Sequence, residues 1–214
     1  MTIEAEPVSR APWRSLAARW PEAAIVTASL VAYCWSIGRN GWGNPYYAAA
    51  VRSMTRSWHT FFYASLDPGG WVTVDKPPLA FWVQALAVRV LGFHQWVLLV
   101  PAAACGAATV ALTMAAVRRV ADRSAALVTG VTLGMTPAVV AMSRSNMPDI
   151  YVTFFAAIAA WAAVRSFESD ALRWPVLVGV ALGLDFDPQH ARYGNGGRPG
   201  GAADAGVAVE QGVV

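Results

Sequence analysis

Apolar residues in this chain gather in long runs instead of alternating with polar ones. An α-helix needs about 20 apolar residues to cross a bilayer, and four runs approach that length: 23–37, 97–117, 125–142 and 150–164. A soluble protein of 214 residues could not bury so many helices of this kind. Because a chain inside lipid must pair its backbone polar groups internally, the pattern predicts an all-α, polytopic membrane protein.

Composition and charge agree with a membrane protein. The sequence is 56% hydrophobic and only 14% charged, whereas about a quarter of the residues of a soluble protein carry charge. The formal net charge is +3, but no basic stripe with interleaved aromatic residues is present, so nucleic acid is not an expected partner. Cys34 and Cys105 lack the spacing of a metal site or redox motif, and we expect small packing residues there.

The distribution of arginine predicts the topology. Arg10, Arg14 and Arg19 precede the first apolar run, which places the N-terminus of a multi-pass cell-membrane protein in the cytoplasm. Residues 35–38 lack the pattern of a signal-peptide cleavage site, so the first span should stay uncleaved. The basic cluster 118–124 is expected inside as well. The resulting domain, 1–184, has predicted spans at about 22–38, 95–117, 125–142, 149–165 and 174–184, with 39–94 as an outer loop.

A helix is predicted early in the outer loop. Asn44 followed by Pro45 is a favourable helix start, with Asn as the N-cap and Pro in the first helical position. Tyr47, Val51 and Met54 then fall on one face at helical spacing. Such a short amphipathic helix is expected to lie in the membrane interface.

Two further segments of the loop, 57–65 and 79–91, are also predicted to lie along the surface. The first is short and aromatic, which suits an interfacial helix. The second is shorter than the roughly 17 residues that a span needs, and it carries Arg89. If 79–91 crossed the membrane, the next span would deliver the arginines of 118–124 to the outside, against the expected topology.

The character of the sequence changes after residue 184. Residues 185–214 are rich in Gly and Ala and have no apolar period, and they would end the last span too early for it to cross. We interpret this tail as disordered sequence that follows a truncation, for example through a shift of reading frame in the gene. The alternative is a genuine short tail after a re-entrant segment.

The motif Asp75-Lys76-Pro77-Pro78 is a candidate binding element at the predicted outer face. A lysine ammonium is a compact point charge that can hold a phosphate. The two prolines stiffen the chain directly after it and fix its direction. On the residues alone, an equally good interpretation is a surface salt bridge that caps the helix expected at 79–91.

Asp149 begins the predicted span 149–165 at the same outer face. Arg144 and Asn146 precede it in a short turn, and a basic and an acidic side chain together at a membrane rim suit a charged head group. The simpler interpretation is that Asp149 complements the dipole of its helix from the first turn. His59 has no second histidine or cysteine at a spacing that would complete a set of metal ligands. No residue is therefore assigned to a metal.

The order of these segments resembles the bacterial branch of glycosyltransferase family 39. The stretch 44–92, which includes NPYYAAAVRSM and VDKPPLAFW, is followed by a long span, a basic turn, another span and SNMPDIYVTFF. That branch includes the protein O-mannosyltransferases and is similar to the lipid A aminoarabinose transferases. The resemblance covers about residues 13–184 and is nearest an actinobacterial subgroup. It implies a GT-C-like fold, of which this chain would be the N-terminal part.

The resemblance also implies an activity and a site. The donor would be a polyprenyl-phosphate-linked sugar, mannose-like or a pentose, and the sugar would pass with inversion to a lipid, glycan or protein acceptor. The implied residues are Asp75 and Asp149 as catalytic carboxylates, with Lys76, Arg144, Asn44 and Asn146 as phosphate- or substrate-binding groups. No cofactor is required by this pattern, but the aminoarabinose branch uses the acid before the lysine in a metal-containing site, so a divalent metal stays open.

One departure from the family pattern concerns the general base. The family has an acidic pair where this chain has Gly43-Asn44, and an amide cannot take up a proton at neutral pH. Asp67 or Asp75 could substitute for the missing acid. Two other functions therefore stay open, a non-catalytic membrane protein that binds polyprenyl-phosphate lipids and an inactive fragment.

Overall fold

The computed structural model describes residues 19–185, and over this range the chain is helical without a β-strand. Only an isolated bridge between Ser65 and Thr73 has β geometry in that range. The predicted all-α, GT-C-like class is therefore confirmed. The helices are α1 (Trp20–Cys34), η2 (Ile37–Asn40), α2 (Pro45–Met54), α3 (Trp58–Phe62), α4 (Leu79–Leu91), α5 (Gln95–Val120), α6 (Arg123–Met135), α7 (Pro137–Ser143), α8 (Asp149–Glu168) and α9 (Arg173–Asp185).

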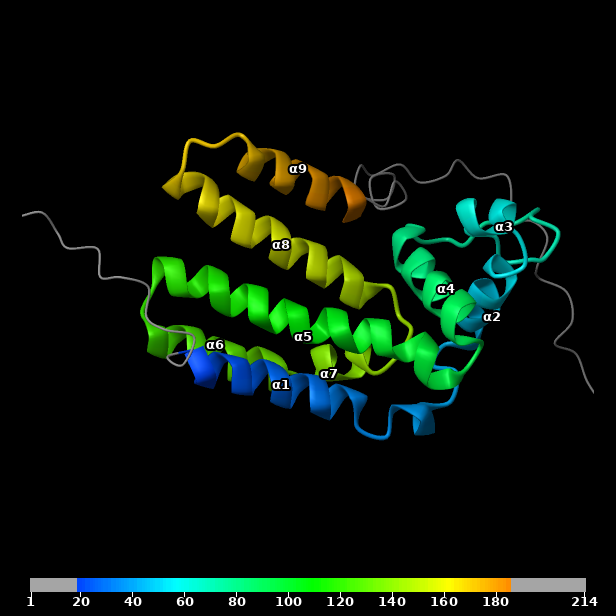
Figure 1. The fold of residues 1–214 in the computed structure, drawn as a ribbon, viewed down its shortest axis with the longest axis horizontal. Coiled ribbons are helices and arrows are strands. Elements are labelled where there is room, and N and C mark those ends of the chain that lie inside the picture. The colour runs from blue at the N-terminus through cyan, green and yellow to red at the C-terminus, as the bar shows by residue number, and fades with distance from the viewer. Residues whose placement is uncertain (1–18, 186–214) are drawn as a thin grey trace, which may run out of the picture.

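The long helices form a layered bundle with α5 at its centre (Figure 1). Helix α5 packs against α1, α6 and α7 on one side and against α8 on the other, and α9 covers α8. Helices α2, α3 and α4 form a smaller group at one end of the bundle, where α4 also contacts α5. The charged motif 75–78 lies in this end group, directly before α4.

Two described helices, α5 and α8, are long and apolar enough to cross a membrane, and a third span exists if α6 and α7 are taken together. This pair bends by 61° at Thr136, whose ψ of 122° is extended. Pro137 follows, and proline disfavours the helical conformation of the residue before it. The sequence predicted a single segment over 125–142, and this bend was missed. The other proline within a predicted span, Pro101, lies inside α5 without ending that helix.

The remaining predicted spans are short helices over the described residues. Helix α1 has 15 residues and α9 has 13, fewer than the roughly 17 that a perpendicular span needs. Helix α9 thus begins and ends close to the predicted 174–184. The predictions for the tail after it concern residues outside the described part of the chain, apart from residue 185.

The end group confirms the helix predicted after Asn44. The Asn44 side chain accepts a hydrogen bond from the Tyr46 backbone N–H at 3.0 Å, and Pro45 occupies the first position of α2. Tyr47, Val51 and Met54 share one face of α2, as their spacing predicted, and that face is buried within the protein. Together with residues of α4 and the start of α5 they form one hydrophobic core.

Helix α4 has the predicted bounds and contains Arg89 among apolar residues. The contacts of the Arg89 side chain explain how the charge is accommodated there. Its guanidinium donates hydrogen bonds to the backbone oxygens of Met54 (2.8 Å) and Ser57 (2.6 Å). It also lies over the Trp58 ring, 4.1 Å from the ring centroid, where a cation–π interaction is favourable. The charge therefore fixes the junction between α2 and α3 against α4.

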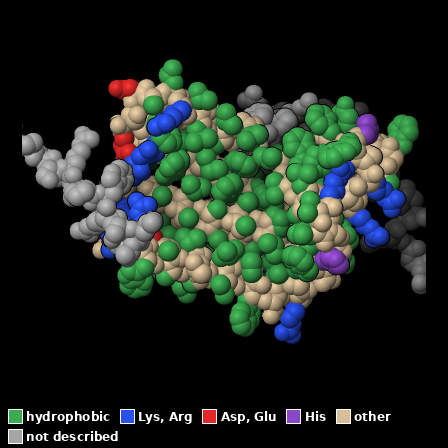
Figure 2. Space-filling model, viewed as in Figure 1, with side chains coloured by type: hydrophobic (Ala, Val, Ile, Leu, Met, Phe, Trp, Pro, Cys, Tyr) green, Lys and Arg blue, Asp and Glu red, His purple; other side chains and the backbone are tan. Residues whose placement is uncertain are grey.

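Charged residues of the bundle gather at its two ends. Figure 2 shows an apolar surface over the long helices, with basic side chains at both ends of the view. At the end opposite the α2–α4 group, Glu22 pairs with Arg118 and Arg123, which joins α1 to the turn between α5 and α6. Arg119 pairs with Glu168 and so joins α5 to α8. Basic side chains therefore lie at both ends of the bundle, and at the Glu22 end Arg118, Arg119 and Arg123 pair with acidic residues.

Close approach of α5 to α7 depends on Gly106. A Cβ built at Gly106 would lie 2.8 Å from Ser143 Cβ and 3.2 Å from a ring carbon of Tyr33, and still closer to Ser143 Oγ. Small residues at such a contact let helices in a membrane pack backbone to backbone. The Tyr33 hydroxyl donates to Gly134 O at 2.9 Å, which holds α1 to the end of α6 beside this contact.

We expect Gly106→Ala to lower the free energy of unfolding by about 1–3 kcal/mol, because the added methyl group overpacks the contact. The measurement is loss of helical circular dichroism during titration with SDS in mixed micelles. Gly179→Ala is the matched control, because no other described helix or side chain comes within 4 Å of a Cβ there, and alanine favours helix by up to about 1 kcal/mol. Equal effects of the two substitutions would contradict the close contact.

Candidate functional site

The motif 75–78 is held in place by its neighbours on both sides. Val74 is buried, and its backbone N–H donates to Ala64 O at 3.0 Å. Pro78 is the N-cap of α4 with φ of −70°, and no side chain caps this helix. The two prolines leave the chain little rotational freedom between this anchor and α4. Asp75 and Lys76 are therefore held at a fixed position before the helix. Asp75 is exposed there and Lys76 is half-buried.

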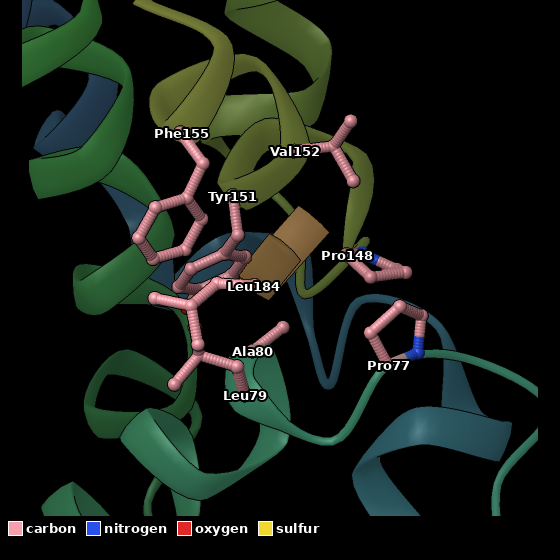
Figure 3. Close-up of a pocket in the computed structure, with 8 residues that line it drawn as sticks. All are labelled: Pro77, Leu79, Ala80, Pro148, Tyr151, Val152, Phe155 and Leu184. Carbon is pink, nitrogen blue, oxygen red and sulfur yellow. The ribbon is translucent and has the colours of Figure 1, made fainter. Parts of the chain in front are cut away.

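Asp149 reaches the same place from the other side of the bundle. It is the first residue of α8 and half-buried, and the next residue, Ile150, is fully buried. Pro77 and Pro148 line one pocket (Figure 3). Each of these prolines is the chain neighbour of a charged residue, Lys76 or Asp149. The structure thus brings together the two segments that sequence analysis placed on one face.

Within the described part of the chain, the charged side chains of this site are unpaired. Neither carboxylate, of Asp75 or of Asp149, accepts a hydrogen bond, and the Lys76 ammonium has no ion pair or hydrogen bond. Among the described residues, the structure thus offers no support for the alternative interpretation of Lys76 as part of a salt bridge that caps α4. The dipole interpretation of Asp149 stays compatible with its place in the first turn of α8.

Tyr47 lies near the site, although the sequence placed it only on the apolar face of the helix after Asn44. It lies on α2, is buried, and packs against Phe81 with ring centroids 5.2 Å apart. Burial raises the pKa of its phenol, and the charges of Asp75 and Asp149 raise it further. Both acids therefore lie within electrostatic reach of one hydroxyl group. A tyrosine on the buried face of the first loop helix was the available signal, but its spacing alone did not separate a core role from a site role.

The pocket beside these charges is apolar. Its enclosed volume is about 20 Å³, room for about one water molecule and far less than the roughly 300–1,000 Å³ of small-molecule sites. Tyr151, Val152 and Phe155 supply the wall from α8, and Leu184 supplies it from α9 (Figure 3). Leu79 and Ala80 contribute the first turn of α4. The geometry is a small apolar groove, and Lys76 and Asp149 are the chain neighbours of two of its lining residues.

The Arg144 side chain is engaged with backbone oxygens rather than directed to a free anion site. Its guanidinium donates to the backbone oxygens of Ala32 (2.7 Å), Tyr33 (3.0 Å) and Trp35 (2.8 Å). These oxygens belong to the end of α1 and the residue after it, where carbonyl groups lack helical partners. A role of Arg144 in phosphate binding stays a prediction. A phosphate would have to be bound by the guanidinium N–H groups that these backbone oxygens do not use.

The two predicted asparagines pair with each other. The Asn146 side chain accepts from the backbone N–H of Asn44 at 2.6 Å and donates to the backbone oxygen of Asn44 at 3.1 Å. The Asn44 side chain caps α2 and lies 3.8 Å from Met147 Sδ. Substrate binding by either side chain likewise stays a prediction, since both are used within the protein.

Asp67, one of the two acids that could replace the missing base, is engaged elsewhere. Its carboxylate accepts backbone hydrogen bonds from Val72 (2.7 Å) and Trp71 (3.3 Å). The hydrogen bond from Val72 is the main reason that the pKa of Asp67 lies below its ordinary value. A carboxylate whose pKa is lowered is a weaker base, so the unpaired acids are the better candidates.

No group of three or more His, Cys, Asp or Glu side chains that could hold a metal ion occurs among residues 19–185. Asp75 and Asp149 offer carboxylate oxygens, which are suitable ligands for Mg²⁺. Such an ion would complete its coordination with water and the phosphate oxygens of a ligand, as Mg²⁺ commonly does. The residues present therefore fit a metal only together with a phosphate-bearing ligand.

Comparisons with known proteins agree with the family resemblance. Among curated proteins, the chain is 35% identical over 163 residues to "Putative mannosyltransferase YycA" of Bacillus subtilis. The aligned region covers 76% of this chain and 24% of that protein. "Putative mannosyltransferase YkcB" of the same species is 33% identical over 76% of this chain and 23% of its own length. A polyprenol-phosphate-mannose–protein mannosyltransferase of Corynebacterium glutamicum is 27% identical over 67% of this chain and 28% of that protein.

The chain spans about a quarter of the length of these curated relatives. No solved structure matches it significantly. The sequence model of the family described as "Dolichyl-phosphate-mannose-protein mannosyltransferase" matches residues 75–189, more than half of the chain. The match begins at Asp75 and includes the groove residues of α4, α8 and α9. This chain, a membrane protein with apolar helices, therefore belongs to the dolichyl-phosphate-mannose-protein mannosyltransferase family of glycosyltransferases.

Proposed function

We propose that the chain binds a polyprenyl-phosphate-linked sugar, mannose-like, and takes part in transfer of the sugar to an acceptor hydroxyl at the outer membrane face. The observation that carries this proposal is that Lys76 and two carboxylates, all unpaired among the described residues, lie within two positions in the chain of prolines that line a small apolar groove. The ligand that satisfies both parts has a phosphate and a long apolar chain. The Corynebacterium relative carries such a donor, polyprenol-phosphate-mannose, in its name.

The two parts of the donor would contribute different terms to binding. Isoprenoid units beside Tyr151, Phe155 and Leu184 would gain about 0.8 kcal/mol for each buried methylene group. The phosphate would meet Lys76, a point charge that has no competing partner in the described residues. Because Lys76 is half-buried, solvent screens this attraction less than it would on an open surface.

The carboxylates would act on the sugar and the acceptor. Transfer with inversion needs a base that takes the proton of the acceptor hydroxyl and positive charge that stabilises the departing phosphate. Asp75 or Asp149 would supply the base, since Asp67 is engaged with backbone N–H groups, and the other acid would orient a substrate. Tyr47 would be available to the ligand as a hydrogen-bond donor, because burial and the charges of both acids raise the pKa of its phenol.

The same geometry supports a second function without catalysis. Asn44 stands where the family has an acid, and its side chain caps α2, so the site has fewer free acids than the family pattern. A membrane protein that only binds polyprenyl-phosphate lipids would need Lys76 and the groove but no base. In either case we propose the cell membrane as the location, with the N-terminus in the cytoplasm, from the arginines that precede the first apolar run and those of the cluster 118–124. The acceptor would be a protein, glycan or lipid.

Transfer is the test of the catalytic proposal. Membranes that contain the chain are expected to transfer [³H]mannose from polyprenyl-phosphate-[³H]mannose to endogenous acceptors, above membranes without it. Replacement of the base removes a contribution of about 10²–10⁴, so Asp75→Asn or Asp149→Asn should lower the rate at least about 100-fold. Asp170→Asn, an exposed residue between α8 and α9, is the matched control. Absence of transfer, with binding that depends on Lys76, would favour the non-catalytic function.

Lys76 gives a direct test of phosphate binding because it is the only lysine in the sequence. Farnesyl phosphate is expected to slow acetylation of Lys76 by N-hydroxysuccinimidyl acetate, measured by mass spectrometry, whereas farnesol is not. Lys76→Ala should weaken binding of farnesyl phosphate about tenfold or more, a loss of about 1.4 kcal/mol. Arg56→Ala, another exposed cation of the end group, should leave it unchanged. Equal protection by farnesol would contradict a phosphate site at Lys76.

A further inference from the structure

Asn146 joins two distant parts of the chain by an amide pair. Its side chain is fully buried, and it bonds to both the N–H and the C=O of Asn44, at 2.6 and 3.1 Å. A two-point hydrogen bond to one residue fixes the orientation of that residue as well as its distance. The two residues are 102 positions apart, so this contact is tertiary and not part of a local turn.

Gly43 allows this close approach. Its φ of 66° lies in the left-handed region, which favours glycine. A Cβ at this position would lie 3.1 Å from both Asn146 Cγ and Asn146 N. Either a side chain or an ordinary backbone conformation at residue 43 would therefore displace Asn146 from its partner.

The pair connects the starts of two helices that carry site residues. On one side, Asn44 caps α2 through its bond from Tyr46 N–H, so the position of Asn44 sets where α2 begins and where Tyr47 lies. On the other side, Asn146 precedes Asp149 and the rigid residue Pro148. The distance between Tyr47 and Asp149 is thus controlled through one amide group.

The turn that carries Asn146 is itself anchored. Arg144 donates three hydrogen bonds to the end of α1, and its backbone oxygen accepts from the Asn40 side chain at 2.9 Å. Ser143, just before it, packs against Gly106 of α5. The turn therefore holds Asn44 from a fixed position of the bundle and does not move freely with the loop.

We propose that Asn146 is a positioning residue, which holds the start of α2 against α8 so that Tyr47, Asp75 and Asp149 face one ligand. This inference rests on the proposed function, because it concerns the same site. It differs from the role expected from sequence, in which Asn146 contacts the substrate. A positioning residue can be replaced by any other link of the same length, whereas a substrate ligand cannot.

The first experiment measures the link without reference to function. Hydrogen exchange of the 44–47 backbone amides, followed by mass spectrometry in nanodiscs, is expected to become at least about tenfold faster in Asn146→Ala. Exchange in α5 and α8 should not change. Asn40→Ala is the matched control, because Asn40 also bonds to the turn but not to α2. Unchanged exchange at 44–47 in Asn146→Ala would overturn the proposal.

The second experiment separates positioning from substrate contact. Asn146→Ala is expected to raise the Kd for farnesyl phosphate about tenfold. In the double variant Gly43→Cys/Asn146→Cys, a disulfide would restore the link, since Asn146 Cγ marks a possible Sγ position 3.1 Å from a Cβ at residue 43. Binding should recover in the oxidised form and be lost on reduction. Weak binding in both forms, with the disulfide shown by mass spectrometry and slow exchange restored at the amides of Asn44, Tyr46 and Tyr47, would mean that the Asn146 amide itself contacts the ligand.

The two experiments fail in distinguishable ways. If the unmodified chain does not bind farnesyl phosphate, the proposed function fails. The exchange measurement still decides whether Asn146 holds the start of α2. If the chain binds and Asn146→Ala changes exchange without a change in Kd, the link is purely structural and the positioning proposal is overturned.

Discussion

A backbone inside hydrocarbon has no water to bond to, so each amide and carbonyl group of α5 and α8 must find its partner within the protein. This requirement confines irregular backbone, and with it most of the charge, to the ends of the helices. Asp75 and Lys76 lie before α4, and Asp149 begins α8. The candidate site is therefore placed at one bundle end because that is where helix starts meet.

Local features of the sequence were sufficient to predict the elements of this site. The Asn44-Pro45 start of α2, the bounds of α4 and the beginning of α8 at Asp149 were all predicted correctly. Each depends on a capping residue, a proline or an apolar period within a few positions. The convergence of motif 75–78 with Asp149 followed from topology, because alternate crossings return segments to the same face.

Features that depend on tertiary contacts were not predicted. Arg144 and Asn146 were assigned to a ligand from their chemistry, but their partners are backbone groups that lie 102 or more positions away. The wall formed by Leu184 and the place of Tyr47 beside two acids likewise require the helices to be packed. The bend at Thr136 was missed because proline is accommodated in some membrane helices and not in others.

The arrangement of the site combines rigid supports with unpaired charge. Prolines and the Asn146 amide fix the positions of the residues, whereas the Lys76 ammonium and the carboxylates have no partners in the described part of the chain. Partly buried charges without partners cost free energy, and a ligand that pairs with them would recover that cost. A phosphate-bearing lipid would do so with its head group while its chain covers the groove.

The central claim is that one lipid-phosphate lies with its head at Lys76 and its chain in the groove beside it. Photolabelling tests this claim directly with a polyprenyl phosphate that carries a diazirine in its first isoprene units. After irradiation in nanodiscs, mass spectrometry should find the label on residues 77–80 and 148–155, and excess unlabelled polyprenyl phosphate should remove it. Label spread evenly over the apolar helices would contradict the account. So would label concentrated at the opposite bundle end, where Glu22 pairs with Arg118 and Arg123.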